Sequence, residues 1–337
     1  MEKVTDPAEL CGMRLKNHLV RSATWFGLCR PDGTLLPEMY ERYETLAAGG
    51  VGMIITELTD VSEWNNAIGD NMRLYSDRLI PDYQKLVSIA HRYGAVILPE
   101  LNMYLYVSSA APHRVIEVNS LSIDDIADIR RLFVDAAVRS YRCGFDGVQL
   151  HLAYGWLLYR FLSPWFNRRR DAYGGSVENR ARIVTEIIHG IKERLPGYPV
   201  SAKFSFYVNR SLTDYDTENC VAICDFLYQN GLDFIEVLGD HSGLEHGNHH
   251  PSCYQDLAIA VRQQSDIPLI LTGCNSDPGV MNALLNDHGI PFFGISRGLI
   301  REPDLPNRWA AGDAAPGHCI HCDGCYQTLA HHCRFVY

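Results

Sequence analysis

Short runs of apolar and β-branched residues alternate with longer amphipathic stretches along most of this chain. Eight runs have the length and composition of buried strands: 18–24, 51–58, 95–101, 146–151, 200–205, 233–238, 268–273 and 291–297. Periodicity near 3.6 predicts helices over 37–48, 77–93, 122–143, 177–195, 213–230, 254–264, 277–287 and 303–311. Strict alternation predicts an α/β fold with a parallel sheet, and eight strands close economically into a (β/α)8 TIM barrel.

An open, doubly wound sheet is the alternative, but no Gly-x-Gly-x-x-Gly motif follows a strand. Net charge is −10 with both signs mixed along the chain, which argues against nucleic-acid binding. No run of 18 apolar residues and no apolar N-terminal signal is present, so we expect no membrane partner. The 11 cysteines are then expected as thiols or metal ligands in a cytoplasmic protein.

The connection after the fourth strand is the most distinctive segment. Residues 146–182 read DGVQLHLAYGWLLYRFLSPWFNRRRDAYGGSVENRAR. His151 ends the strand, and Tyr154 and Trp156 open a long loop rich in aromatic residues and arginine. Because barrel enzymes build their active sites on the loops after the strands, we expect the active site here.

This segment closely resembles the signature of the Old Yellow Enzyme family of flavin oxidoreductases. The matching order is a strand-end His, then Phe-Leu-Ser-Pro, Asn-x-Arg, Asp-x-Tyr-Gly-Gly-Ser and Glu-Asn-Arg. The resemblance implies bound FMN, with NADH or NADPH as the reductant. Family members are often oligomers, so a homo-oligomer is compatible with it.

The loops after the seventh and eighth strands are the expected phosphate site of a parallel barrel. They carry Gly273 and Cys274, then Ser296 and Arg297. By the family resemblance these four residues hold the FMN phosphate, the first three through the backbone. Cys274 and Ser296 replace family glycines, so we expect negative φ at both.

Lys203 lies inside the apolar fifth strand, where an unpaired ammonium is costly. The alternative to a functional lysine is an outward-facing charge. The resemblance places Lys203 near flavin N1, Ser22 and Ala23 at backbone contacts, and the Thr24 hydroxyl at flavin O4. It also places Thr56 beside the ring.

Glu100 is a departure, because the family usually has a glutamine there that pairs with the pyrimidine edge of the flavin. An ionised carboxylate accepts hydrogen bonds but donates none. We expect Glu100 either to lower the flavin potential or to be held neutral. The alternative is that Glu100 points at an arginine or lysine elsewhere.

The residues expected to contact the substrate also differ from the family pattern. In the family a His/His or His/Asn pair binds the carbonyl of an activated alkene, and a tyrosine protonates the product. These positions map to His151 with Tyr154, and to Trp156, whose indole is no useful acid. Either Tyr154, Tyr104, Tyr106 or water supplies the proton, or the reaction is not simple alkene reduction.

Residues 312–337 form a tail with four cysteines and four histidines. Cys319, Cys322, Cys325 and Cys333 follow the pattern C-x2-C-x2-C-x7-C, which indicates ligation by four thiolates. The tail resembles the [4Fe–4S] segment of the dienoyl-CoA reductase and trimethylamine dehydrogenase group, although its last gap is shorter. Zinc, with help from the tail histidines, and free thiols remain alternatives. We expect a barrel over 1–311 with the tail packed on it.

A second group of histidines follows the sixth strand: His241, His246, His249 and His250. Their spacing fits no standard metal pattern, which favours a polar substrate loop over a metal site.

The function expected from all of this is reduction of an activated C=C bond of a small conjugated molecule by an FMN enzyme. Three alternatives remain. The first is an oxidative or redox-neutral flavoenzyme such as an amine dehydrogenase or isomerase. The second is an electron-transfer component that takes electrons from a donor protein. The third is a flavin-free barrel with a zinc tail.

Overall fold

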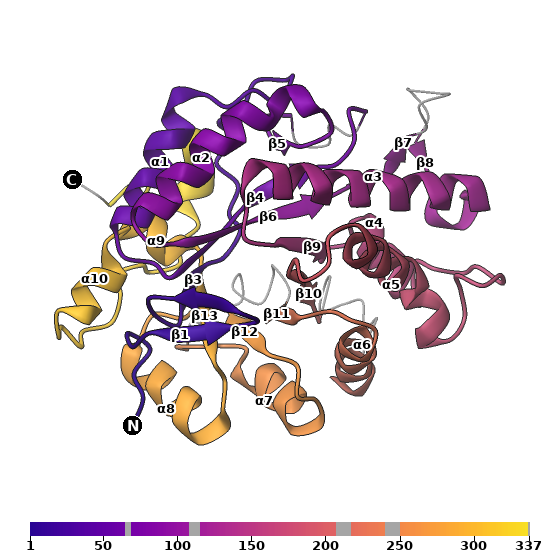
Figure 1. Cartoon of the computed structure of the whole chain (residues 1–337). Coiled ribbons are helices and arrows are strands. Elements are labelled where there is room, and N and C mark those ends of the chain that lie inside the picture. The colour runs from indigo at the N-terminus through magenta and orange to yellow at the C-terminus, as the bar shows by residue number, and fades with distance from the viewer. Residues whose placement is uncertain (65–68, 108–114, 207–216, 240–249, 336–337) are drawn as a thin grey trace.

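The computed structural model describes residues 1–64, 69–107, 115–206, 217–239 and 250–335. Eight parallel strands close a barrel, because β3 pairs with both β13 and β4. The barrel strands are β3 (Leu19–Arg21), β4 (Met53–Asp60), β6 (Val96–Asn102), β9 (Val148–Leu152), β10 (Val200–Ser205), β11 (Phe234–Leu238), β12 (Leu269–Thr272) and β13 (Phe292–Ile295). Figure 1 shows the helices surrounding these strands, which confirms the predicted (β/α)8 barrel.

The connecting helices agree with the periodicity of the sequence. They are α1 (Pro37–Ala48), α2 (Ile80–Arg92), α3 (Ile123–Cys143), α5 (Val177–Arg194), α6 (Thr217–Gln229), α7 (Gln255–Gln264), α8 (Pro278–His288) and α10 (Leu305–Ala310). The expected start of α6 at residue 213 lies outside the described residues. Ser122 caps α3 through the backbone N–H of Asp125, and Gly144 ends it in the left-handed conformation.

Several short elements were not expected from the sequence. They are the helices α4 (Leu157–Leu162) and α9 (Arg297–Arg301), the strands β1 (Ala8–Leu10), β2 (Met13–Leu15), β5 (Met72–Arg73), β7 (Tyr106–Val107) and β8 (Val115–Ile116), and the 3-10 turns Val118–Ser120, Gly324–Gln327 and Leu329–His331. The 3-10 turn Asp77–Leu79 falls within the helix expected over 77–93. Segments of two to six residues are too short to show a periodicity. No helix among the described residues is long and apolar enough to cross a membrane.

The barrel interior is apolar at one end only. The β1–β2 hairpin contributes Leu10, Met13 and Leu15 to a buried cluster. Inward side chains of the strands complete it: Val20, Met53, Ile55, Val96, Leu98, Phe234, Ile270 and Phe292. This barrel-floor cluster closes the end at which the strands begin and leaves the other end for polar side chains.

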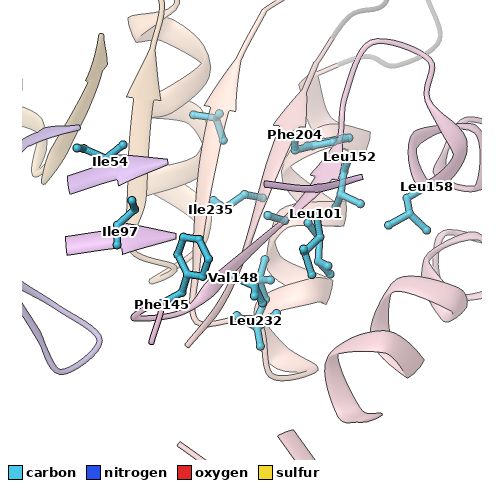
Figure 2. Packing of buried hydrophobic residues seen from close by; sticks show 14 of the residues in the cluster. Ile54, Ile97, Leu101, Phe145, Val148, Leu152, Leu158, Phe204, Leu232 and Ile235 are labelled. Atoms are coloured by element: carbon cyan, nitrogen blue, oxygen red, sulfur yellow. The ribbon is translucent and has the colours of Figure 1, made fainter. Parts of the chain in front are cut away.

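A second, larger core fills the layer between strands and helices. Figure 2 shows part of it, where Val148, Leu152 and Phe204 on neighbouring strands point to the same side as Leu101. Helix residues such as Leu158 join this cluster. The two cores hold the strands from both sides and so fix where their carboxyl ends lie.

The tail contacts the barrel at the carboxyl ends of the strands. Asp323 forms an ion pair with Arg297, and the guanidinium of Arg42 on α1 donates to the carbonyl of Ala330 at 3.3 Å. The ring of His331 meets Trp25 edge-on, with centroids 5.1 Å apart. These contacts agree with a tail packed on the barrel, and the division at 311/312 stays a prediction.

The barrel-floor cluster predicts a large stability effect at Ile55, which is 1% exposed. Ile55→Ala should lower the free energy of unfolding by about 2–5 kcal/mol, because a cavity replaces a buried side chain. Reversible urea unfolding measures this difference.

The matched control is Ile123→Ala at the first turn of α3, where the side chain is 55% exposed. It should change stability by no more than about 0.5 kcal/mol. Equal effects at Ile55 and Ile123 would contradict the assigned core.

Candidate active site

A cavity of about 400 Å³ opens at the carboxyl ends of the barrel strands. It brings together twelve of the thirteen residues predicted for catalysis or FMN binding: Ser22, Ala23, Thr24, Glu100, His151, Tyr154, Trp156, Lys203, Gly273, Cys274, Ser296 and Arg297. They come from six strands or the loops after them, far apart in sequence. The position of the cavity is the one that barrel enzymes use for catalysis.

Thr56 is the predicted residue that the cavity does not include. It is buried on β4, and its hydroxyl donates to the carbonyl oxygen of Glu57 at 3.2 Å. The register of β4 against β6 shifts between Ile55 and Leu58, which changes the side that successive side chains face. Leu58 lines the cavity instead.

Lys203 points into the barrel, so the outward orientation considered from the sequence is wrong. Its ammonium lies 3.7 Å from a Glu100 oxygen and 3.8 Å from a Glu236 oxygen. It also donates to the Ser22 hydroxyl at 3.3 Å. Burial alone would lower the pKa of Lys203, but the two carboxylates outweigh it and raise the pKa. The lysine is therefore a fixed cation beneath the cavity.

Glu100 is held between two nitrogen groups. One of its oxygens lies 3.0 Å from His151 Nδ1, and both side chains are almost fully buried. Burial raises the pKa of Glu100, yet Lys203 and His151 together lower it below its usual value. Of the two states expected from the sequence, this favours the ionised Glu100 over the neutral one. The lysine near Glu100 is Lys203, which lies in the same site and not elsewhere.

Glu236 is a site residue that the sequence reasoning missed. It is fully buried and accepts hydrogen bonds from the Ser22 hydroxyl, from Gln149 Nε2 at 2.9 Å and from the Thr272 hydroxyl at 2.8 Å. The signal was present, because a glutamate inside the apolar strand FIEVL is as costly as Lys203 is. Parallel pairing sets Glu236 directly opposite Lys203.

His151 presents a buried nitrogen to the cavity. Its Nδ1 faces Glu100, while its Nε2 has no hydrogen-bond partner in the described part of the chain. The rings of Tyr154 and Trp156 lie 5.9 Å and 5.3 Å from the imidazole. A buried polar atom without a partner at a cavity wall is costly unless a ligand satisfies it.

Tyr154 follows β9 in a tight turn with φ 55°, and its backbone N–H donates to the Ser205 hydroxyl at 3.1 Å. Burial raises the pKa of its phenol, so Tyr154 acts as a neutral hydrogen-bond donor. Tyr106 is directed elsewhere, since its hydroxyl donates to Asp128 at 2.9 Å. Tyr104 stacks edge-on against Trp156 at 5.0 Å.

The phosphate end has one backbone difference from expectation. Ser296 has φ −103° as predicted, but Cys274 has φ 52°, so the negative φ expected at Cys274 is wrong. Left-handed backbone is unfavourable for a residue with a side chain and is kept only where the surroundings enforce it. Arg297 is buried there and forms the ion pair with Asp323.

Tyr254 also lines the cavity and was not predicted from the sequence. Its ring lies against the backbone of two glycines. A Cβ added to Gly239 would lie 2.1 Å from this ring, and one added to Gly273 would lie 2.3 Å from it. Only glycine fits at both positions, because a side chain there would collide with the Tyr254 ring.

The four tail cysteines line a second cavity of about 170 Å³. It shares Arg297, Cys319 and His321 with the first cavity, so the two adjoin. Within the described ranges, no three His, Cys, Asp or Glu side chains converge closely enough to hold a metal ion. His241, His246 and His249 lie outside the described residues, and His250 is exposed.

The first cavity fits an FMN. At one end are a buried arginine and the glycine-containing loops that can approach a phosphate closely. Lys203 is a buried cation, and a cation near N1 is what stabilises a reduced flavin. Over the same space, His151 and Tyr154 offer polar groups to a second molecule.

Comparison with known proteins agrees with this geometry. The metal reductase of Desulforamulus reducens is 28% identical over 351 aligned residues, covering 98% of this chain and 52% of that protein. The NADH oxidase of Thermoanaerobacter brockii is 30% identical over 337 residues, covering 92% and 51%. The chain thus spans about half the length of these relatives.

The fold is shared with a solved structure of 2-naphthoyl-CoA reductase in complex with 2-naphthoyl-CoA. The TM-score is 0.85 at 20% identity, over 96% of this chain and 54% of that one. The sequence profile of the NADH:flavin oxidoreductase / NADH oxidase family matches residues 3–315, nearly the whole chain. This chain therefore belongs to that family of FMN-dependent oxidoreductases, which confirms its resemblance to Old Yellow Enzyme.

Proposed function

We propose that this FMN enzyme uses NADH or NADPH to reduce an activated C=C bond in a small conjugated carbonyl compound. The observation that carries the proposal is the buried, unpartnered Nε2 of His151 at the cavity wall, backed by Glu100. A substrate carbonyl oxygen is the group that this nitrogen, when protonated, would bind.

The cofactor would be held by three groups of residues. Gly273, Cys274, Ser296 and Arg297 would bind the phosphate, Ser22, Ala23 and Thr24 would run beneath the ring, and Lys203 would lie near N1. Bound FMN supplies a hydride to the substrate after its own reduction by NAD(P)H. Thr56 has no part in this arrangement, since Leu58 takes its place at the cavity.

The proton for the product would come from His151. Glu100 lies 3.0 Å from Nδ1 and orients the ring so that Nε2 faces the cavity. When Nε2 carries a proton, it donates into the cavity. Tyr154 would be the second donor to the carbonyl oxygen. Trp156 would shape the pocket, because indole supplies no proton.

The partner proposed is thus a small molecule. Homo-oligomerisation, a cytoplasmic location and a donor protein remain predictions. An oxidative or redox-neutral reaction is the competing proposal. It is favoured by Trp156 alone, whereas the Glu100–His151 pair supplies the acid that reduction needs.

We further propose that the tail cysteines bind a [4Fe–4S] cluster, with zinc as the alternative metal. The support is that Cys319, Cys322, Cys325 and Cys333 all line one cavity beside the flavin site. Among the tail histidines, His318 and His321 reach this cavity. A cluster there would accept single electrons from a donor protein.

The proposed reaction predicts stoichiometric NAD(P)H oxidation with an enone such as cyclohexenone under anaerobic conditions. His151→Phe should lower kcat/KM for the enone by about 10²–10⁴-fold, since it removes both carbonyl binding and general acid catalysis. Flavin reduction by NAD(P)H, followed by stopped-flow absorbance, should change far less.

The control is Tyr104→Phe, which removes a hydroxyl from a residue outside the cavity wall and should leave kcat/KM unchanged. Substrate loss without NAD(P)H consumption would instead favour the redox-neutral reaction.

The proposed position of Glu100 predicts a higher flavin potential in the Glu100→Gln variant. Glutamine can still accept a hydrogen bond from Nδ1 but carries no charge. The midpoint potential of bound FMN should rise, because a nearby negative charge is removed.

A spectroelectrochemical titration measures the effect. An unchanged potential would refute an electrostatic role of Glu100 at the flavin.

The proposed cluster predicts iron and acid-labile sulfide in anaerobically purified protein, with a broad absorbance that dithionite bleaches. Cys322→Ser should abolish both while FMN stays bound, because the thiolates hold the metal. Cys11→Ser, far from the tail in sequence, should leave both unchanged. Bound zinc without iron would favour zinc as the metal of the site. A protein that contains neither iron nor zinc would refute the site.

A further inference from the structure

Two cysteines outside the tail lie against each other at the phosphate end of the cavity. Cys274 follows β12, and Cys253 stands just before α7. The backbone N–H of Ser252 donates to the carbonyl of Cys274 at 3.0 Å, which holds the two segments side by side. Each of the two thiols shifts the pKa of the other, as neighbouring thiols do. The Sγ of Cys253 lies 3.3 Å from where a Cβ on Gly273 would be.

We propose that Cys253 and Cys274 form a reversible disulfide that clamps the Tyr254 segment onto the phosphate-binding loop. Disulfides require Cα atoms about 4.4–6.8 Å apart. The backbone bond from Ser252 to Cys274 and the Cys253 sulfur beside Gly273 bring the two segments together. No step of the proposed reaction uses either thiol.

The two thiols differ in the way that disulfide exchange requires. Cys253 is partly exposed, whereas Cys274 is buried. The hydrogen bond from Cys274 lowers the pKa of Cys253, against the effect of burial, and Arg297 lowers it further. Cys253 is thus the nucleophile, and Cys274, whose pKa is raised by the same contact, is the resolving thiol.

The oxidant is a low-molecular-weight disulfide such as glutathione disulfide. The Cys253 thiolate attacks one of its sulfurs, forming a mixed disulfide and releasing one glutathione thiolate, which takes up the proton that Cys253 lost. Cys274 then attacks the Cys253 sulfur, transfers its proton and releases the second glutathione. Two protein thiols are oxidised and one disulfide is reduced to two thiols, so protons and electrons balance.

The buried cysteines of α6 lack this arrangement. Cys220 and Cys224 lie one turn apart on α6 and are both fully buried in the core. Burial raises the pKa of Cys224 far above its usual value, which makes it a poor nucleophile. The pair at 253 and 274 is therefore favoured for disulfide exchange over the pair on α6.

The proposed disulfide would act on FMN binding through Tyr254. Its ring already lies against Gly273, and Tyr254 is the residue next to Cys253. A covalent bond to Cys274 would keep this ring over the loop that holds the FMN phosphate. This step rests on the proposed FMN site, and it predicts slower exchange of FMN in the oxidised protein.

Peptide mapping tests the bond itself. The holoenzyme is treated with glutathione disulfide, free thiols are alkylated, and trypsin cuts at Arg262 between the two cysteines. Cys274 is the one cysteine of the peptide 263–297. We expect this peptide to be linked to 211–262 through Cys253, in wild type and in the exposed control Cys11→Ser but not in Cys253→Ser. Absence of the linked peptide from the wild type would overturn the proposal.

FMN release, followed by flavin fluorescence after dilution, tests the clamp. The rate should fall at least about fivefold on oxidation of the wild type, the lower end of typical coupling. It should not change on oxidation of Cys253→Ser, and dithiothreitol should reverse the effect. A linked peptide with an unchanged release rate would overturn the clamp. A linked peptide in protein without flavin would support the disulfide site and refute the proposed FMN function instead.

Discussion

The position of Lys203 between Glu100 and Glu236 is the constraint on which the rest of the site depends. A buried charge costs several kcal/mol, and removing one partner from such a group typically costs about 3–5 kcal/mol. Parallel pairing sets Lys203 opposite both His151 and Glu236. A shift of any of these strands by one residue would turn its charge into the apolar layer between strands and helices. The charges that serve a flavin therefore also fix the register of the barrel.

This cluster can be buried because the barrel has two different ends. The barrel-floor cluster, closed by the β1–β2 hairpin, supplies apolar burial where the strands begin. Above it the inward positions are polar, and Ser22, Gln149 and Thr272 satisfy Glu236. Stability is concentrated at one end of the strands and chemistry at the other, so loops at the cavity can vary without loss of the core.

The sequence predicts the barrel and most of the site because both rest on local patterns. Strand and helix periodicity defines the fold, and the family motifs point to residues at strand ends. What was missed depends on contacts between distant segments. The register shift in β4, which brings Leu58 instead of Thr56 to the cavity, depends on how β4 pairs with β6. The left-handed backbone of Cys274 and the ring of Tyr254 are set by the packing of two loops. Glu236 was recognisable by the argument used for Lys203, but no family motif drew attention to it.

Two departures from the family pattern explain each other in this arrangement. Replacing the usual glutamine by Glu100 places a negative charge against His151, and replacing the usual tyrosine by Trp156 removes a proton donor. Alone, the first would oppose a reduced flavin and the second would leave the product without its proton. In the proposed reaction, together they move the proton donor from the loop to His151 at the strand end, where Glu100 orients the imidazole. Lys203 lies 3.7 Å from the same carboxylate and limits the cost to the flavin.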